Sequence, residues 1–124
     1  MNTLKLEIEV EDQFLDDILI NSIECGYSGY WAGFTEYKSE VPSFKIREED
    51  EDSIEGDPVE PWILVDRAFI LKGIATVLKT DFSVCTSIRN YILTGAKEND
   101  AGNIDAECTD VILQAALLGE LTYG

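Results

Sequence analysis

Five basic side chains are concentrated in one part of an otherwise acidic chain. Residues 62–97 contain these bases and only two acids, whereas the whole chain of 124 residues carries 25 acidic and 9 basic residues and a net charge of -16. The bases are Arg67, Lys72, Lys79, Arg89 and Lys97. A guanidinium can hold phosphate through paired hydrogen bonds. This segment therefore predicts a site for a small phosphorylated molecule, with Arg67 and Arg89 contacting the phosphates, unless the bases only offset local repulsion.

Aromatic residues among glycines supply a second candidate element of such a site. Tyr30 and Trp31 follow Gly26 and Gly29, and an aromatic face beside a glycine can stack on a purine base for roughly 1–3 kcal/mol. Further along, Phe82 could also stack, and Asn90 could hydrogen-bond a base or ribose edge. The alternative is that the rings of Trp31 and Phe82 belong to the core and that Asn90 is simply exposed.

Asp105, Glu107 and Asp110 form the last candidate group. They are expected in the first turns of a buried helix, where capping and pairing with the helix dipole explain them. Alternatively, a carboxylate there, Asp105 above all, could accept hydrogen bonds from ribose hydroxyls. Asp105 also precedes a long apolar stretch, so it is equally suited to cap the N-terminus of a helix. The sequence predicts no metal site and no cofactor. Residues 50–61 fit a calcium loop poorly, because Ile54 occupies a ligand position.

The chain contains no histidine, which removes the commonest general base and every Ser-His or Cys-His pair. We therefore expect a binding protein rather than an enzyme, with a carboxylate-based activity on the same ligand as an alternative. The three cysteines are widely spaced and suit reduced thiols. No apolar run is long enough to span a bilayer, and the N-terminus lacks a signal-peptide pattern.

The acidity of the chain also limits its partners. A net charge of -16 repels nucleic acid and anionic membranes at long range. We expect a cytoplasmic protein that binds neither. A basic protein partner is the alternative, in which case the chain would act as an acidic mimic of DNA or as another inhibitor of a DNA-binding or defence enzyme.

The elements that must position these residues form one α+β domain over residues 1–124. Residues 3–10 alternate strictly and predict a half-buried strand, and a helix follows from Glu11 to a stop at Gly26. A turn then leads into a strand ending near Tyr37, and residues 43–47 predict its hairpin partner. Residues 48–60 contain eight acids and predict a flexible loop.

The second half of the chain is predicted to be mainly helical. A short buried strand over residues 62–65 precedes a helix that begins near Asp66, with Leu71 among its inward residues. A segment over residues 82–93, with Tyr91 inward, ends at Gly95. A buried helix runs from Asp105 to Leu118, and residues 121–123 add a last short strand. The result is a small, mostly antiparallel sheet in the N-terminal half, packed with helices mainly from the C-terminal half.

Two stretches of the chain resemble a widespread set of small phage proteins. Residues 18–31 resemble a motif in which a helix leads into Gly-x-x-x-Tyr-Trp, and residues 105–124 resemble the closing motif of the set, which also ends in Tyr-Gly. Residues 62–73 look like the region between, so the similarity covers nearly the whole chain. Departures are Cys25 where glycine is usual, Leu118 where an aromatic residue is usual, and the unusually acidic loop.

This set is similar to the first type of phage anti-defence sponges that act against the Thoeris system. The resemblance implies a homo-oligomer that binds and sequesters a cyclic ADP-ribose isomer or a cyclic oligonucleotide without turnover in an infected bacterial host. Combined with the residue chemistry, it predicts that Arg67 and Arg89 meet the diphosphate, that Phe82 or Trp31 stacks on adenine, and that Asn90 or Asp105 holds ribose.

Overall fold

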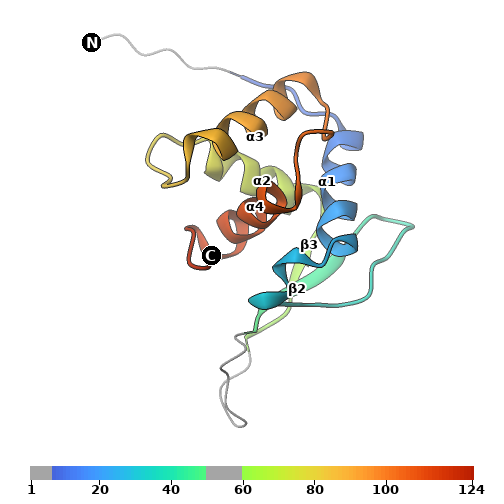
Figure 1. The fold of residues 1–124 in the computed structure, drawn as a ribbon. Coiled ribbons are helices and arrows are strands. Elements are labelled where there is room, and N and C mark those ends of the chain that lie inside the picture. Colours follow the sequence, from blue (N-terminus) through green and yellow to red (C-terminus); the bar gives the residue numbers. More distant parts are fainter. Residues whose placement is uncertain (1–6, 50–59) are drawn as a thin grey trace.

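The structure is a computed structural model that describes residues 7–49 and 60–124 (Figure 1). The fold is α+β, as predicted, with a three-stranded antiparallel sheet in the N-terminal half and most helices after it. The elements in chain order are α1 (Asp12–Glu24), the 3-10 turn η1 (Tyr27–Tyr30), β1 (Ala32–Phe34), β2 (Phe44–Glu48), β3 (Ile63–Val65), α2 (Arg67–Val77), α3 (Thr86–Glu98) and α4 (Ala106–Leu118).

The sheet has the order β1-β2-β3, so the predicted hairpin of the first two strands is confirmed. Phe44 faces Val65 across the central strand pair, and both side chains are buried. On the opposite face, Lys45 lies beside Leu64 and both are exposed. The prediction of a buried strand over 62–65 is therefore only partly correct. Val65 is buried, whereas Leu64 on the opposite face and Ile63 at the first position of β3 are exposed.

Helix ends follow the capping residues in the sequence. Asp66 accepts a hydrogen bond from the amide of Phe69 at 3.0 Å and begins α2. Asp105 accepts one from the amide of Cys108 at 2.9 Å and begins α4. Both carboxylates also lie at the positive end of a helix dipole. Gly119, with φ of 77°, ends α4 in the left-handed conformation that glycine adopts without strain.

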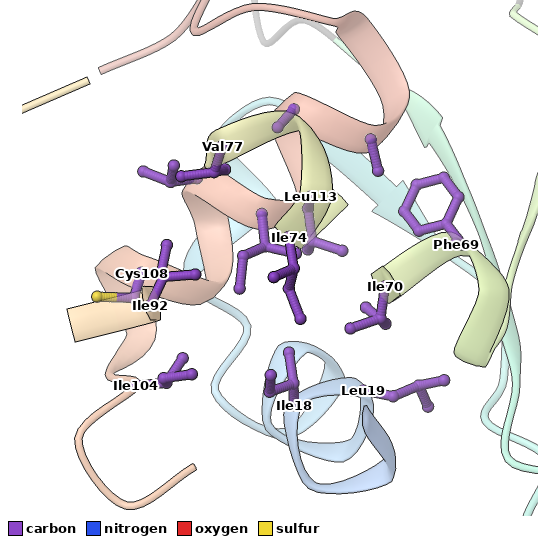
Figure 2. Packing of buried hydrophobic residues seen from close by; sticks show 14 of the residues in the cluster. Ile18, Leu19, Phe69, Ile70, Ile74, Val77, Ile92, Ile104, Cys108 and Leu113 are labelled. Carbon is purple, nitrogen blue, oxygen red and sulfur yellow. The ribbon is translucent and has the colours of Figure 1, made fainter. Parts of the chain in front are cut away.

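The core lies between α1, α2 and α4, with α3 contributing from one side (Figure 2), and the same cluster includes the buried residues of the sheet. Ile74 of α2 and Leu113 of α4 pack together near its centre. The two helices approach closely at Gly73, because a Cβ atom there would lie 2.5 Å from the carbonyl oxygen of Ile112. This close approach fixes the position of α4, which carries the central residues of the candidate site.

The predicted N-terminal strand is not formed where the structure describes it. Residues 7–10 are extended without strand pairing, and residues 1–6 lie outside the described part of the chain. The segment is held instead by Asn99, whose side chain accepts from the amide of Glu11 at 2.6 Å and donates to the carbonyl of Glu9 at 3.2 Å. Ile8 and Val10 still pack against the core, so the apolar pattern identified burial but not strand pairing.

Three other expectations from the second half are corrected. The third helix does not end at Gly95 but continues to Glu98 and ends at Asn99, which adopts a left-handed conformation with φ of 50°. Gly95 is needed instead for close contact, because a Cβ atom there would lie 2.9 Å from the Ile104 side chain. Leu71 and Tyr91 are exposed. In each helix the residue next to them, Ile70 or Ile92, lies on the apolar face that packs into the core.

The predicted strand over residues 121–123 is also absent, and this segment is held by a side chain described below. Most of the predicted acidic loop, residues 50–59, lies outside the described residues.

Candidate functional site

Asp110 is the centre of a buried polar network. It lies on α4 with only 4% of its surface exposed. One carboxylate oxygen accepts hydrogen bonds from the Ser28 hydroxyl at 2.6 Å and the Trp31 indole at 2.7 Å. The other accepts from the Tyr30 hydroxyl at 2.9 Å and the Gln114 amide at 3.0 Å. A carboxylate offers about four acceptor positions, so Asp110 is saturated by groups of the protein itself.

The chain between α1 and β1 is shaped so that three donors reach this carboxylate. Gly26 adopts a left-handed conformation with φ of 60° after α1, and the four-residue turn η1 follows at once. The tight turn brings Ser28, Tyr30 and Trp31 to one side of the chain, where all three face Asp110. The fourth donor, on Gln114, lies one turn further along α4, on the same face as Asp110.

Gln114 extends the network to the C-terminal segment. Its side-chain oxygen accepts hydrogen bonds from the amides of Thr122 and Tyr123 at 3.0 Å each, and its nitrogen donates to the Tyr123 carbonyl at 3.1 Å. The side chain thus pairs with the segment much as a neighbouring strand would. The ring of Tyr123 stacks on Trp31, with ring centres 5.5 Å apart and planes inclined by 10°. Its hydroxyl donates to Glu48 on β2.

The network has an electrostatic consequence for Tyr30. Burial raises the pKa of the Tyr30 hydroxyl well above its ordinary value, and the hydrogen bond to Asp110 and the charge of that carboxylate raise it further. Tyr30 therefore remains a neutral donor to Asp110 at any physiological pH. The network joins the residues on which the resemblance depends, from Trp31 through Gln114 to Tyr123.

A groove of about 310 Å³ lies against this network, at the small end of the roughly 300–1,000 Å³ typical of ligand sites. It is bordered by η1, the beginning of α3, α4 and the C-terminal segment. Asp110 and Gln114 line its floor. Tyr27, with 48% of its surface exposed, and Glu107 line its walls. None of the described residues that line the groove is lysine or arginine.

Cys85 also borders the groove, at the N-cap of α3. A hydrogen bond with the Ser87 hydroxyl lowers the pKa of this exposed thiol, and backbone amides at the start of the helix act in the same direction. Cys108 differs, because burial raises its pKa to about 12. Cys85 is therefore a useful chemical reporter of the groove.

The structure separates most of the site residues predicted from the sequence. Of that set, only Tyr30 lines the groove. Trp31 is fully buried at 0% exposure, and Phe82 is buried as well, so neither ring offers an open face for stacking. Both rings belong to the core, which was the alternative to stacking on a ligand. Asn90 is exposed on α3, and Asp105 serves as the N-cap of α4.

The two arginines lie at opposite ends of α2. Arg67, at its first residue, forms ion pairs with Asp16 at 2.8 Å and Asp12 at 3.1 Å. Arg89 donates to the carbonyl of Val77, the last residue of α2, and to the carbonyl of Phe82. At 1.5 Å per residue, these ends are about 15 Å apart. One diphosphate cannot reach both guanidinium groups within one chain, so the predicted cationic clamp is not formed there.

Sequence reasoning missed the residues that build the groove. Ser28 and Gln114 were not chosen. Glu107 and Asp110 were grouped with Asp105 as acids that cap the helix or pair with its dipole, and only Asp105 was chosen as a ligand contact. A usable signal was present, because Asp110 and Gln114 are four residues apart on a helix that is apolar on most sides. Polar side chains at buried positions are normally hydrogen-bonded to other groups of the protein. The hydroxyl and indole groups that follow Gly26 were suitable donors for the Asp110 carboxylate.

No protein-family model matches the chain, and neither a curated protein nor a solved structure matches it. No helix in the described part of the chain is both long enough and apolar enough to cross a membrane.

Proposed function

We propose that this protein is a non-enzymatic binding protein that captures a small nucleotide-derived signal, such as a cyclic ADP-ribose isomer or a cyclic oligonucleotide. By the resemblance described above, it would act as a phage anti-defence sponge in the cytoplasm of an infected bacterium, as a homo-oligomer. One observation carries the proposal. The two stretches that resemble the phage proteins meet at Asp110, and residues of both stretches border the same groove, which is large enough for a small ligand.

Capture without turnover suits the chemistry of the groove. Its floor is rigid, because the acceptor positions of Asp110 are filled by protein donors. A carboxylate in that state is poorly placed to act as a general base, and the chain has no histidine to replace it. A preorganised floor still favours binding, since little side-chain freedom is lost when a ligand arrives.

The charge distribution supports one orientation of a phosphorylated ligand. The groove walls carry Glu107 and no described lysine or arginine, and the chain as a whole has a net charge of -16. The neutral part of the ligand is therefore expected inside the groove, with its phosphates outside it. Raising the salt concentration should then strengthen binding modestly, because salt screens the repulsion between like charges.

Isothermal titration calorimetry with cyclic ADP-ribose isomers and cyclic oligonucleotides tests the proposal. We expect saturable binding of at least one of these ligands and recovery of the ligand intact by chromatography after long incubation. Light scattering on the same sample measures the oligomeric state. An absence of binding across the panel would rule out the sponge, and a converted ligand would indicate an enzyme instead.

An acidic surface for a basic protein partner is the second candidate. The observation that favours it is that two arginines are already neutralised by neighbouring acids, Arg67 by Asp16 and Arg47 by Glu49. A purified complex with a DNA-binding or defence enzyme that weakens steeply with salt would support this function. Replacing the acids of residues 50–60 with amides, which keeps Glu48 as the acceptor of the Tyr123 hydroxyl, should then abolish that complex and leave ligand capture unchanged.

A further inference from the structure

The polar groups on the floor of the groove are already hydrogen-bonded within the protein, so few of them can bind a ligand. Both oxygens of Asp110 are occupied, and the side-chain oxygen of Gln114 accepts from the amides of Thr122 and Tyr123. The Gln114 nitrogen has acceptors on Asp110 and Tyr123. A ligand that competed for these groups would have to break buried hydrogen bonds at a cost of about 1–3 kcal/mol each. Specific contacts must therefore come from the walls.

Two wall groups are open. Glu107 is exposed on the first turn of α4, and no described residue hydrogen-bonds its carboxylate. Tyr27 has 48% of its surface exposed, and its ring is held by an edge-to-face contact with Tyr30 at 6.1 Å and 87°. Ile88 adds an apolar surface to the same groove. The groove therefore combines an exposed aromatic face, a free double acceptor and an apolar side.

We infer that this groove recognises the ribonucleoside part of the ligand, with the Tyr27 ring stacked on the base and the Glu107 carboxylate accepting hydrogen bonds from the ribose hydroxyls. An aromatic ring can stack on any base, and an acidic side chain is the usual acceptor for a ribose hydroxyl in nucleotide sites. The phosphates would then lie outside the groove, away from the Glu107 carboxylate. The inference rests on the proposed function for the nucleotide character of the ligand.

Titrations with adenosine and its deoxy analogues, followed by protein NMR, test this assignment. We expect adenosine to bind, and loss of its 2′-hydroxyl to weaken binding about tenfold, as for a hydrogen bond to a charged group. Glu107→Gln should weaken adenosine by a similar factor and have little effect on 2′-deoxyadenosine. Tyr27→Ala should weaken both ligands about tenfold or more. Matched controls are Glu98→Gln and Tyr91→Ala, which alter exposed residues outside the groove.

The outcomes separate this inference from the proposed function. If adenosine binds through Glu107 but no cyclic nucleotide does, the sponge is excluded and the ribonucleoside site stands. If a cyclic nucleotide binds equally well to Glu107→Gln and Tyr27→Ala, the sponge stands and this site assignment is overturned. If adenosine fails to bind while the cation agmatine binds through Glu107, the groove is a cation site and the inference is also overturned. No binding by any of these probes refutes both.

Discussion

Replacing Asp110 with asparagine removes the negative charge and one acceptor oxygen while the shape of the side chain stays almost the same. In the native protein the two oxygens accept from Ser28, Trp31, Tyr30 and Gln114. The amide keeps one oxygen, so the two donors that faced the other lose their acceptor. Hydrogen bonds to a charged group contribute about 1.5–3 kcal/mol each. We expect the free energy of unfolding to fall by about 3–4 kcal/mol, within the range for disrupting a buried charged network.

Urea denaturation, followed by tryptophan fluorescence and far-UV circular dichroism, measures this loss. Trp31 reports directly, because its indole donates to Asp110 and is fully buried. Asp81→Asn is the matched control, since Asp81 is exposed and the charge change is identical; we expect it to stay within about 0.5 kcal/mol of the native protein. If Asp110→Asn unfolds within about 1 kcal/mol of that control, the carboxylate does not hold the turn and the C-terminal segment together, and the reasoning is refuted.

Three further predictions concern other parts of the fold. Gly73→Ala should lower the free energy of unfolding by about 1–3 kcal/mol, despite the better helix propensity of alanine, because the new methyl group meets the α4 backbone; unchanged urea stability would contradict the close helix contact. The hydrogen bond from Arg67 lowers the pKa of Asp16, so this pair stabilises the fold above the ordinary carboxyl pKa and loses that contribution as the pH falls through the lowered value. Arg67→Gln should therefore reduce stability more at pH 7 than at pH 2, and an equal effect at both pH values in thermal denaturation would exclude this ion pair as the cause. Near pH 7, a maleimide should label Cys85 much faster than the buried Cys108, and a ligand in the groove should slow the labelling of Cys85. Mass spectrometry measures the labelling of each cysteine. Unchanged labelling of Cys85 at saturating ligand would contradict binding in the groove.

Local patterns in the sequence predicted much of the fold. The helix that ends before Gly26, the hairpin of β1 and β2, and the capped starts of α2 and α4 all depend on residues close together in the chain. Errors arose where distant residues decide the outcome. Residues 7–10 alternate like a strand but are held by Asn99, and residues 121–123 pair with the side chain of Gln114. Neither partner can be found from the pattern of the segment itself.

The candidate site shows the same limit. Basic residues that are close in the sequence were expected to share one ligand, but Arg67 begins α2, whereas Arg89, on α3, contacts the last residue of α2. In contrast, Asp110 and Trp31 are 79 residues apart and are joined by a hydrogen bond. Sequence spacing predicts proximity within one helix or turn, whereas a site assembled from several elements depends on how those elements pack.

The Asp110 network also changes what the resemblance to phage proteins can mean. Since the carboxylate is saturated by Ser28, Tyr30, Trp31 and Gln114, these residues hold the floor of the groove in place and do not themselves select the ligand. A motif of this kind specifies a common scaffold and leaves the ligand open, because function depends on the residues of the site rather than on the fold. Ligand identity must then come from wall residues that can change without disturbing the network, such as Glu107. A protein that keeps the network but replaces the walls should fold in the same way and bind something else.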